Sequence, residues 1–100
     1  MDELLRLQKW YQQQCNGEWE HHYGVSITSC DNPGWWVKID LVDTKFASKP
    51  FETIEQGDSD SFDPQPPWLK CYVDDGIFNG AGDPQKLADI LEIFLHWCES

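Results

Sequence analysis

Two segments of the chain, one near each end, repeat apolar residues at the spacing of an amphipathic helix. The first runs from Asp2 to Cys15, is followed by the stop signal Asn16-Gly17, and places on one face Leu4, Leu7, Trp10, Tyr11 and Cys15. The second begins with Asp83 as the expected N-cap and Pro84 at the first helical position, and its stripe consists of Leu87, Ile90, Leu91, Phe94 and Trp97 or Cys98. Each helix has a single apolar stripe, so each is expected to cover one face of another element.

Alternating apolar and polar residues between these helices predict a β-hairpin. One strand starts at Val25, a turn follows at residues 31–34, and the second strand runs from Trp35 to Leu41. In the second strand Trp35, Val37, Ile39 and Leu41 share one face. Trp36 is therefore left on the wetter face or beneath a second cover.

A second hairpin is predicted from Trp68 to Val73, through the tight turn Asp74-Asp75-Gly76, into a strand that begins at residues 77–79. A short strand is also expected at residues 51–55. The fold that accounts best for these elements is a two-layer α+β domain, in which both helices pack on one face of an antiparallel sheet of four to five strands. We expect a single domain over residues 1–100, with an acidic, proline-rich loop at residues 56–67.

The charge balance narrows the range of partners. Asp and Glu number 18 against 7 Lys and Arg, which gives a net charge of -11. Nucleic acids and anionic membranes require clustered basic side chains, so neither is an expected partner. The start of the chain lacks the order of a secretory signal, and there is no run of 18 apolar residues, so we expect a cytoplasmic protein.

The four cysteines, at positions 15, 30, 71 and 98, are isolated from one another. Their spacing fits no zinc or CxxC redox motif, so they are interpreted as thiols. No cofactor is predicted.

Three blocks of sequence, in order, carry a family resemblance: LQKWYQQQCNGEWEHHYGVSI, DNPGWWVKIDL and KPF. They resemble the immunity protein 53 family of bacterial polymorphic toxin systems, closely over the first half and more loosely over WLKCYV and the last helix. The acidic loop at residues 59–67 is interpreted as an insertion in this chain. The resemblance implies a cytoplasmic antidote without catalytic activity, which binds a toxin domain and blocks it.

The segment from Glu18 to Gly24 is the densest group of chemically active side chains. Glu20, His21 and His22, with Asp40, could form a metal or acid-base site. However, adjacent histidines cannot both face one way on a strand, and no third ligand lies at a diagnostic spacing. Two alternatives stay open: a loop held by packing of its aromatic side chains, and a contact surface for a partner.

Acidic residues are concentrated between Pro50 and Gln85, where eight acids accompany one base, Lys70. Clustered like charges destabilise a fold, which is explicable if a basic partner such as the cleft of a nuclease toxin docks there. A solvated acidic loop without a partner is the alternative.

We therefore predict an immunity protein that occludes the active site of a toxin through an acidic, aromatic-anchored surface, and that is a monomer or weak homodimer. The alternatives are an acidic interaction domain for another host partner and a small metal-dependent enzyme using His21 and His22. The residues predicted to contact the partner are Glu18, Trp19, Glu20, His22, Tyr23, Trp36, Asp58, Asp60, Asp63, Asp74 and Asp75.

Overall fold

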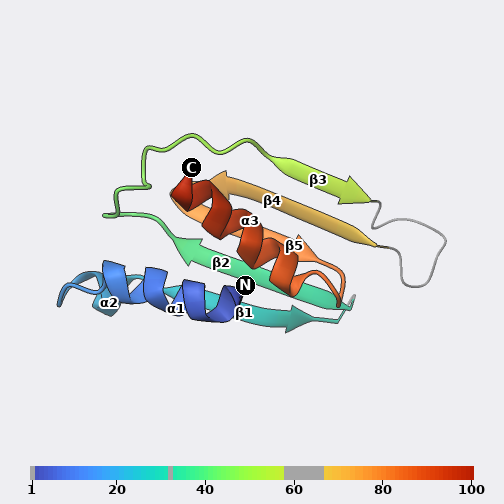
Figure 1. Cartoon of the computed structure of the whole chain (residues 1–100), viewed down its shortest axis with the longest axis horizontal. Helices are drawn as coiled ribbons and strands as arrows, with labels where there is room; N and C mark the ends of the chain where they lie inside the picture. The colour runs from blue at the N-terminus through green and yellow to red at the C-terminus, as the bar shows by residue number, and fades with distance from the viewer. Residues whose placement is uncertain (1, 32, 58–66) are drawn as a thin grey trace.

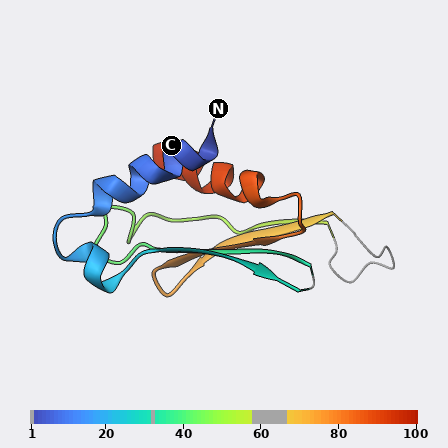
Figure 2. The same ribbon diagram turned by 90° about the horizontal axis from the view of Figure 1, so that it is seen from below.

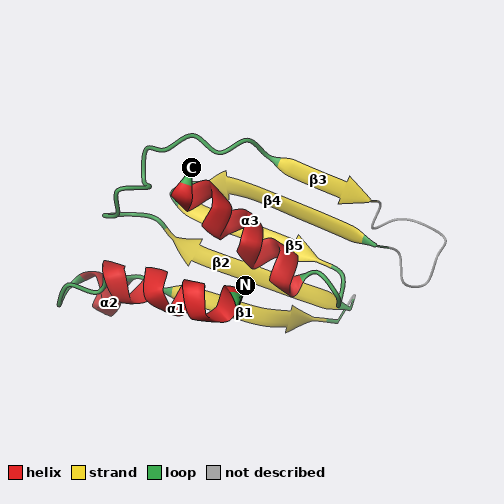
Figure 3. Cartoon of the chain, in the orientation of Figure 1, coloured by secondary structure: helices red, strands yellow, loops and turns green. Residues whose placement is uncertain are grey.

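The computed structural model describes residues 2–31, 33–57 and 67–100 (Figure 1). Its elements, coloured by type in Figure 3, are α1 (Glu3–Gln14), α2 (Trp19–His22), β1 (Val25–Cys30), β2 (Gly34–Asp40), β3 (Ile54–Gly57), β4 (Trp68–Asp74), β5 (Ile77–Gly82) and α3 (Leu87–Glu99).

The five strands form one antiparallel sheet in the order β1-β2-β5-β4-β3. Both predicted hairpins are present, as β1-β2 and β4-β5, and they join in the middle of the sheet through β2 and β5. Figure 2 shows α1 and α3 on the same side of the sheet. The predicted α+β fold, with both helices on one face, is therefore confirmed.

The core between the two layers is rich in aromatic side chains. Phe94 of α3 lies 4.9 Å from the ring centre of Phe78 on β5 and 5.0 Å from that of Trp10 on α1. From β2, the predicted inward residues Val37 and Ile39 are fully buried. The apolar stripes of both helices thus meet over the central strands, and burial of this apolar surface stabilises the fold.

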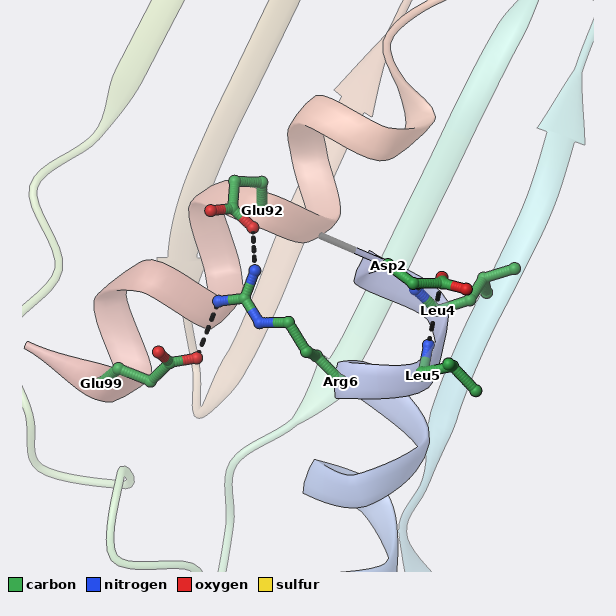
Figure 4. Close-up of polar contacts among 6 residues, drawn as sticks. All are labelled: Asp2, Leu4, Leu5, Arg6, Glu92 and Glu99. Carbon is green, nitrogen blue, oxygen red and sulfur yellow. Dashed lines mark hydrogen bonds and ion pairs between the residues drawn. The ribbon is translucent and has the colours of Figure 1, made fainter.

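Polar contacts fix the two helices to each other (Figure 4). Asp2 caps α1, since its Oδ1 accepts hydrogen bonds from the backbone N–H of Leu4 and Leu5 at 3.0 and 3.4 Å. Arg6 donates from Nη2 to Glu99 at 2.7 Å and from Nη1 to Glu92, both on α3. The Glu99 hydrogen bond, together with that of Glu92, raises the pKa of Arg6.

Strand β3 differs from the prediction, because it covers residues 54–57 and not residues 51–55. Phe51 precedes the strand and contributes to the core from a loop, at 5.6 Å from the ring centre of Phe78 and 5.3 Å from that of Trp97. The loop is held there by a 2.8 Å hydrogen bond from Trp97 Nε1 to the carbonyl of Pro50.

The predicted start of α3 is wrong, because Asp83 is not its N-cap. The helix begins at Leu87, after a turn at residues 84–85. Asp83 instead accepts hydrogen bonds from the backbone N–H of Trp68 and of Gln85, both at 2.9 Å. Its carboxylate therefore ties the end of β5 to the start of β4, which was invisible in the local sequence pattern.

The segment from Glu18 to Gly24 contains the helical turn α2, where a loop was expected. Asn16 Oδ1 accepts from the N–H of Glu18 and Trp19 at 3.0 Å, and the carboxylate of Glu20 accepts from Asn16 and Gly17. This reciprocal pattern resembles a capping box, which stabilises the first turn of a helix.

Candidate protein-binding surface

The sheet face opposite α1 and α3 carries no described helix (Figure 2). We define the open face by the alternate residues of β2, β5 and β4 that point away from the helices. They are Trp36, Lys38 and Asp40, then Ile77, Asn79 and Ala81, and then Trp68, Lys70, Tyr72 and Asp74.

Two aromatic residues on this face lie on either side of β5. Trp36 is 43% exposed, so of the two alternatives left open for it the wetter face holds, and Lys38 Nζ lies 5.1 Å from its ring centre. Tyr72 is half-buried, with Lys70 Nζ at 5.4 Å from its ring. Strand β5 lies between β2 and β4, which carry these rings, so the two strands are about 10 Å apart. Aromatic side chains that are at least partly accessible, with cations over their faces, are typical anchors of protein interfaces.

Carboxylates lie at one end of the open face. The strand register places Asp40 and Asp74 on either side of Ile77. Asp75 follows in the hairpin turn with φ 53°, and Gly76 continues it with φ 75°. Two successive positive φ angles are the signature of a type I′ turn, which Asp-Gly favours. Asp74 and Asp75 are both exposed, so their charges are available to a partner.

The segment around α2 adjoins this acidic end. Gly24 N–H donates to Asp40 Oδ2 at 2.9 Å, and Leu41 N–H donates to the carbonyl of Gly76 in the hairpin turn at 2.8 Å. The structure therefore brings the α2 segment and the Asp74-Asp75 turn to the same end of the sheet, although they are about 50 positions apart in sequence.

The predicted contact residues of the α2 segment have different environments. Trp19 is only 2% exposed, and its Nε1 donates to the carbonyl of Val42 at 3.0 Å, so its ring belongs to the core. Tyr23 is half-buried, with its ring centre 6.3 Å from that of Trp19. Glu18 and His22 are exposed. Of the two alternatives left open, packing accounts for Trp19, whereas the exposed Glu18 and His22 and part of Tyr23 are accessible to a partner.

Glu20 has a structural role in this segment. Backbone hydrogen bonds, from its own N–H and from Asn16 and Gly17, hold the pKa of Glu20 below its usual value. Its charge is present at neutral pH, but its oxygens are already occupied by the turn.

The other predicted acids fall into two groups. Asp58, Asp60 and Asp63 lie outside the described residues. Asp83, one of the eight acids counted between Pro50 and Gln85, is buried and 3.2 Å from Lys86 Nζ. Burial alone would raise the pKa of Asp83, but hydrogen bonds from Gln85 and Trp68 and the Lys86 charge together lower it. Asp83 is therefore a structural acid and no part of an exposed surface.

Three observations on the described residues concern possible metal ligands, two of the cysteines and membrane-spanning helices. Within residues 2–31, 33–57 and 67–100, no three His, Cys, Asp or Glu side chains are grouped so that they could hold a metal ion. Burial raises the pKa of Cys71 and of Cys98 to about 12, which keeps both as unreactive thiols. No helix in these ranges is long and apolar enough to cross a membrane.

Sequence reasoning missed Lys38, Lys70 and Tyr72 as candidate contact residues. The alternation of β2 and β4 contained the signal for these residues. In β4, Leu69 and Cys71 are buried, so Lys70 and Tyr72 must face outward, as Lys38 does in β2. Once Leu69 is assigned to the core, the outward position of Tyr72 follows.

Comparisons with known proteins identify one family. A family model described as Immunity protein 53 matches residues 4–99, so the match includes the second half, where the resemblance noted above is loose. No curated protein and no solved structure matches the chain.

Proposed function

Because the chain belongs to the immunity protein 53 family, we propose that it binds a cognate bacterial toxin domain and neutralises it by covering the active site of the toxin. The observation that supports this most directly is the open face of the sheet, which no described helix covers and on which Trp36 is 43% exposed. The proposed contact surface consists of Trp36, Tyr72, Asp40, Asp74 and Asp75, with Glu18, His22 and Tyr23 at its edge.

The chemistry of this surface fits a protein partner. Trp and Tyr contribute large apolar area and a polar atom at little entropic cost, and such residues dominate binding energy at interfaces. Lys38 and Lys70 shield the two rings from one side and can be displaced when the rings are covered. The carboxylates at one end then supply charge at the rim of the contact, where they determine orientation and association rate.

The net charge of -11 favours a toxin whose active site is basic. Nucleases line their clefts with Lys and Arg to bind phosphates, and carboxylates of an inhibitor can occupy the same positions. We propose a nuclease as the toxin. Asp58, Asp60 and Asp63 are proposed as additional acidic contacts from the sequence alone.

The first experiment is co-purification of the tagged chain with the product of the neighbouring upstream gene, at low and high salt. The expected result is a complex that weakens as salt rises, because surface electrostatics are screened. Cleavage of nucleic acid by the partner, and its loss on adding the chain, would support the nuclease assignment. No complex at any salt, with folded protein in hand, would contradict the proposed function.

A substitution then tests the surface. Trp36→Ala should weaken binding by at least about tenfold, as for an anchor residue at an interface. Leu5→Ala is the matched control, since Leu5 is 60% exposed but lies on α1, away from the open face. Equal affinity of the Trp36 and Leu5 variants would remove the open face from the proposal.

A further inference from the structure

A groove runs beside β3 on the helix side of the sheet, separate from the open face. We call it the β3 groove; its volume is about 740 Å³. Phe51, Ile54, Ile93 and Trp97 supply its apolar lining. These side chains are all half-buried, and each packs against the core on one side only. The groove is therefore an apolar extension of the core that is open to solvent.

The two walls of the groove are joined to each other within the chain. One wall is the segment from Phe51 to Gln56, and the other is the last part of α3. The hydrogen bond from Trp97 to Pro50 joins these two walls at one end. Little ordering is needed to form the site, which favours binding.

Strand β3 offers a free backbone edge beside this groove. It is the last strand of the sheet, with β4 as its one neighbour among the described residues. The carbonyl of Trp68 accepts from Asp83 N–H at 3.1 Å, so Trp68 directs its backbone groups toward β5. The backbone N–H and C=O groups of successive residues in a strand point to opposite neighbours, so those of Leu69 point toward β3 and bond to its register partner Gln56. The next residue, Glu55, therefore points its N–H and C=O away from the sheet.

Acidic residues lie along the free edge of β3 and beside the groove. The described lining of the groove includes Glu52, Glu55 and Glu92 but neither lysine nor arginine. Glu92 is paired with Arg6. Glu55 is opposite Lys70 in the strand register, so its side chain points to the open face, where it lies 3.7 Å from Lys70 in an exposed pair that contributes little. Glu52 and Glu55 thus give the free edge a negative charge.

We propose that an extended segment of the toxin domain adds a strand to the free edge of β3 and places alternate side chains in the β3 groove. This inference rests on the proposed function and names a second contact of the same complex. A strand paired with Glu55 would project every other side chain over the apolar lining, and the residues between them toward the opposite sheet face. The segment is therefore expected to alternate apolar residues with Lys or Arg.

The length of the site sets the length of this segment. The four residues of β3 span about 13 Å, and the helical wall from Glu92 to Ser100 is of similar length. Four to five extended residues would occupy it. A second copy of this chain is a poor occupant, because pairing two β3 strands would bring the glutamates of both copies together.

The test is a proline substitution at the free edge. Glu55→Pro removes the outward N–H without removing a hydrogen bond to β4, and proline is tolerated at such edge positions. Glu55→Gln is the matched control, since it removes the same charge and the Lys70 pair but keeps the N–H. Ser29→Pro is the control at the other edge: Asp40 N–H donates to the Gly24 carbonyl at 3.0 Å, so by alternation Ser29 points its N–H away from β2.

Binding of each variant to the catalytically inactive toxin domain is measured by calorimetry, after melting curves have shown that the variant is folded. We expect Glu55→Pro to weaken binding about tenfold, Glu55→Gln about threefold or less, and Ser29→Pro not at all. Hydrogen exchange on the unmodified chain gives a second readout, because the Glu55 amide should exchange rapidly when free and slowly in the complex.

The outcomes separate this inference from the proposed function. If the unmodified chain does not bind the toxin domain, the proposed function fails. If it binds, and Glu55→Pro has the affinity of Glu55→Gln while the Glu55 amide stays unprotected, only the strand addition is overturned. Weakening by Ile93→Asp without an effect of Glu55→Pro would also overturn it, since the occupant would then pack in the groove as a helix. A dimer of the free chain that Glu55→Pro dissociates would show that the edge pairs with a second copy instead.

Discussion

Asp83 illustrates how one side chain can determine local structure. Its carboxylate holds the N–H groups of Trp68 and Gln85 and lies beside Lys86, and these contacts lower the pKa of Asp83. A carboxyl whose pKa is lower in the folded than in the unfolded chain stabilises the fold at pH values above its ordinary, unfolded-state pKa. This contribution is lost as the pH falls through the pKa of the folded state.

We therefore predict that Asp83→Asn lowers the free energy of unfolding by about 1 to 3 kcal/mol at pH 7, the value of hydrogen bonds to a charged group. The difference from the unmodified chain should shrink as the pH falls below about 4, the ordinary pKa of an aspartate, toward the lower pKa of Asp83 in the folded state. Urea unfolding between pH 3 and pH 7 measures it. Glu52→Gln, at an exposed carboxylate, is the control. A difference that stays constant with pH would show that the charge of Asp83 does not contribute.

At this scale, the sequence identified the residue types of the candidate site better than their roles. The alternation of β2 correctly placed Trp36 on the face opposite Val37 and Ile39, but it left open whether a second layer covers the ring, which the structure leaves 43% exposed. The sequence pattern around Trp19 could not decide whether its ring contacts a partner or packs in the core, because that depends on a hydrogen bond to the carbonyl of Val42, 23 positions away. Asp83 was predicted as a helix cap on local grounds, whereas its partner Trp68 comes from another strand.

At the scale of elements, α3 packs very closely on β5. Gly80 faces the helix, and a Cβ at this position would overlap Cγ2 of Ile90 and lie 3.3 Å from the ring of Phe78. The absence of a side chain at Gly80 therefore sets the distance between the two layers.

Gly80→Ala is expected to destabilise the fold by about 1 to 3 kcal/mol, as overpacking of a core does. Combined with Ile90→Ala, the loss should be smaller than the sum of the single losses, because the new methyl group enters the space that Ile90 leaves. Gly24→Ala is the control, since a Cβ there meets no atom within 4 Å. Denaturant unfolding of the four variants gives these values, and strict additivity would contradict the direct contact.

Elements formed by neighbouring residues were predictable from sequence, and the connections between distant ones were not. Each hairpin is encoded locally by alternation and a turn motif, so β1-β2 and β4-β5 were correctly predicted. The pairing of β2 with β5 and the order of the five strands depend on contacts between distant segments. The start of β3 was predicted three residues too early because Phe51, a large apolar residue, packs in the core from a loop and does not pair in the sheet.

For the molecule as a whole, the distribution of charge matters more than its total. The open face carries Lys38 and Lys70 among its aromatic residues, whereas its acids lie at one end with the Asp74-Asp75 turn. A second group of acids lies along β3 at one edge of the sheet, where Glu52 and Glu55 carry negative charge. A basic partner is therefore attracted to particular edges of the molecule, and a mutation that changes these edges should alter the rate of encounter first.

We predict that Asp74→Lys combined with Asp75→Lys slows association with the toxin domain about tenfold at low salt and changes dissociation less. The effect should decline as salt rises, because the Debye length falls to about 8 Å at physiological ionic strength. Stopped-flow fluorescence at several salt concentrations measures both rates. The control is Glu3→Lys with Asp89→Lys, which changes the net charge equally but in the helix layer. If both pairs slow association to the same extent, the net charge of the chain attracts the toxin and the hairpin turn has no special part in steering.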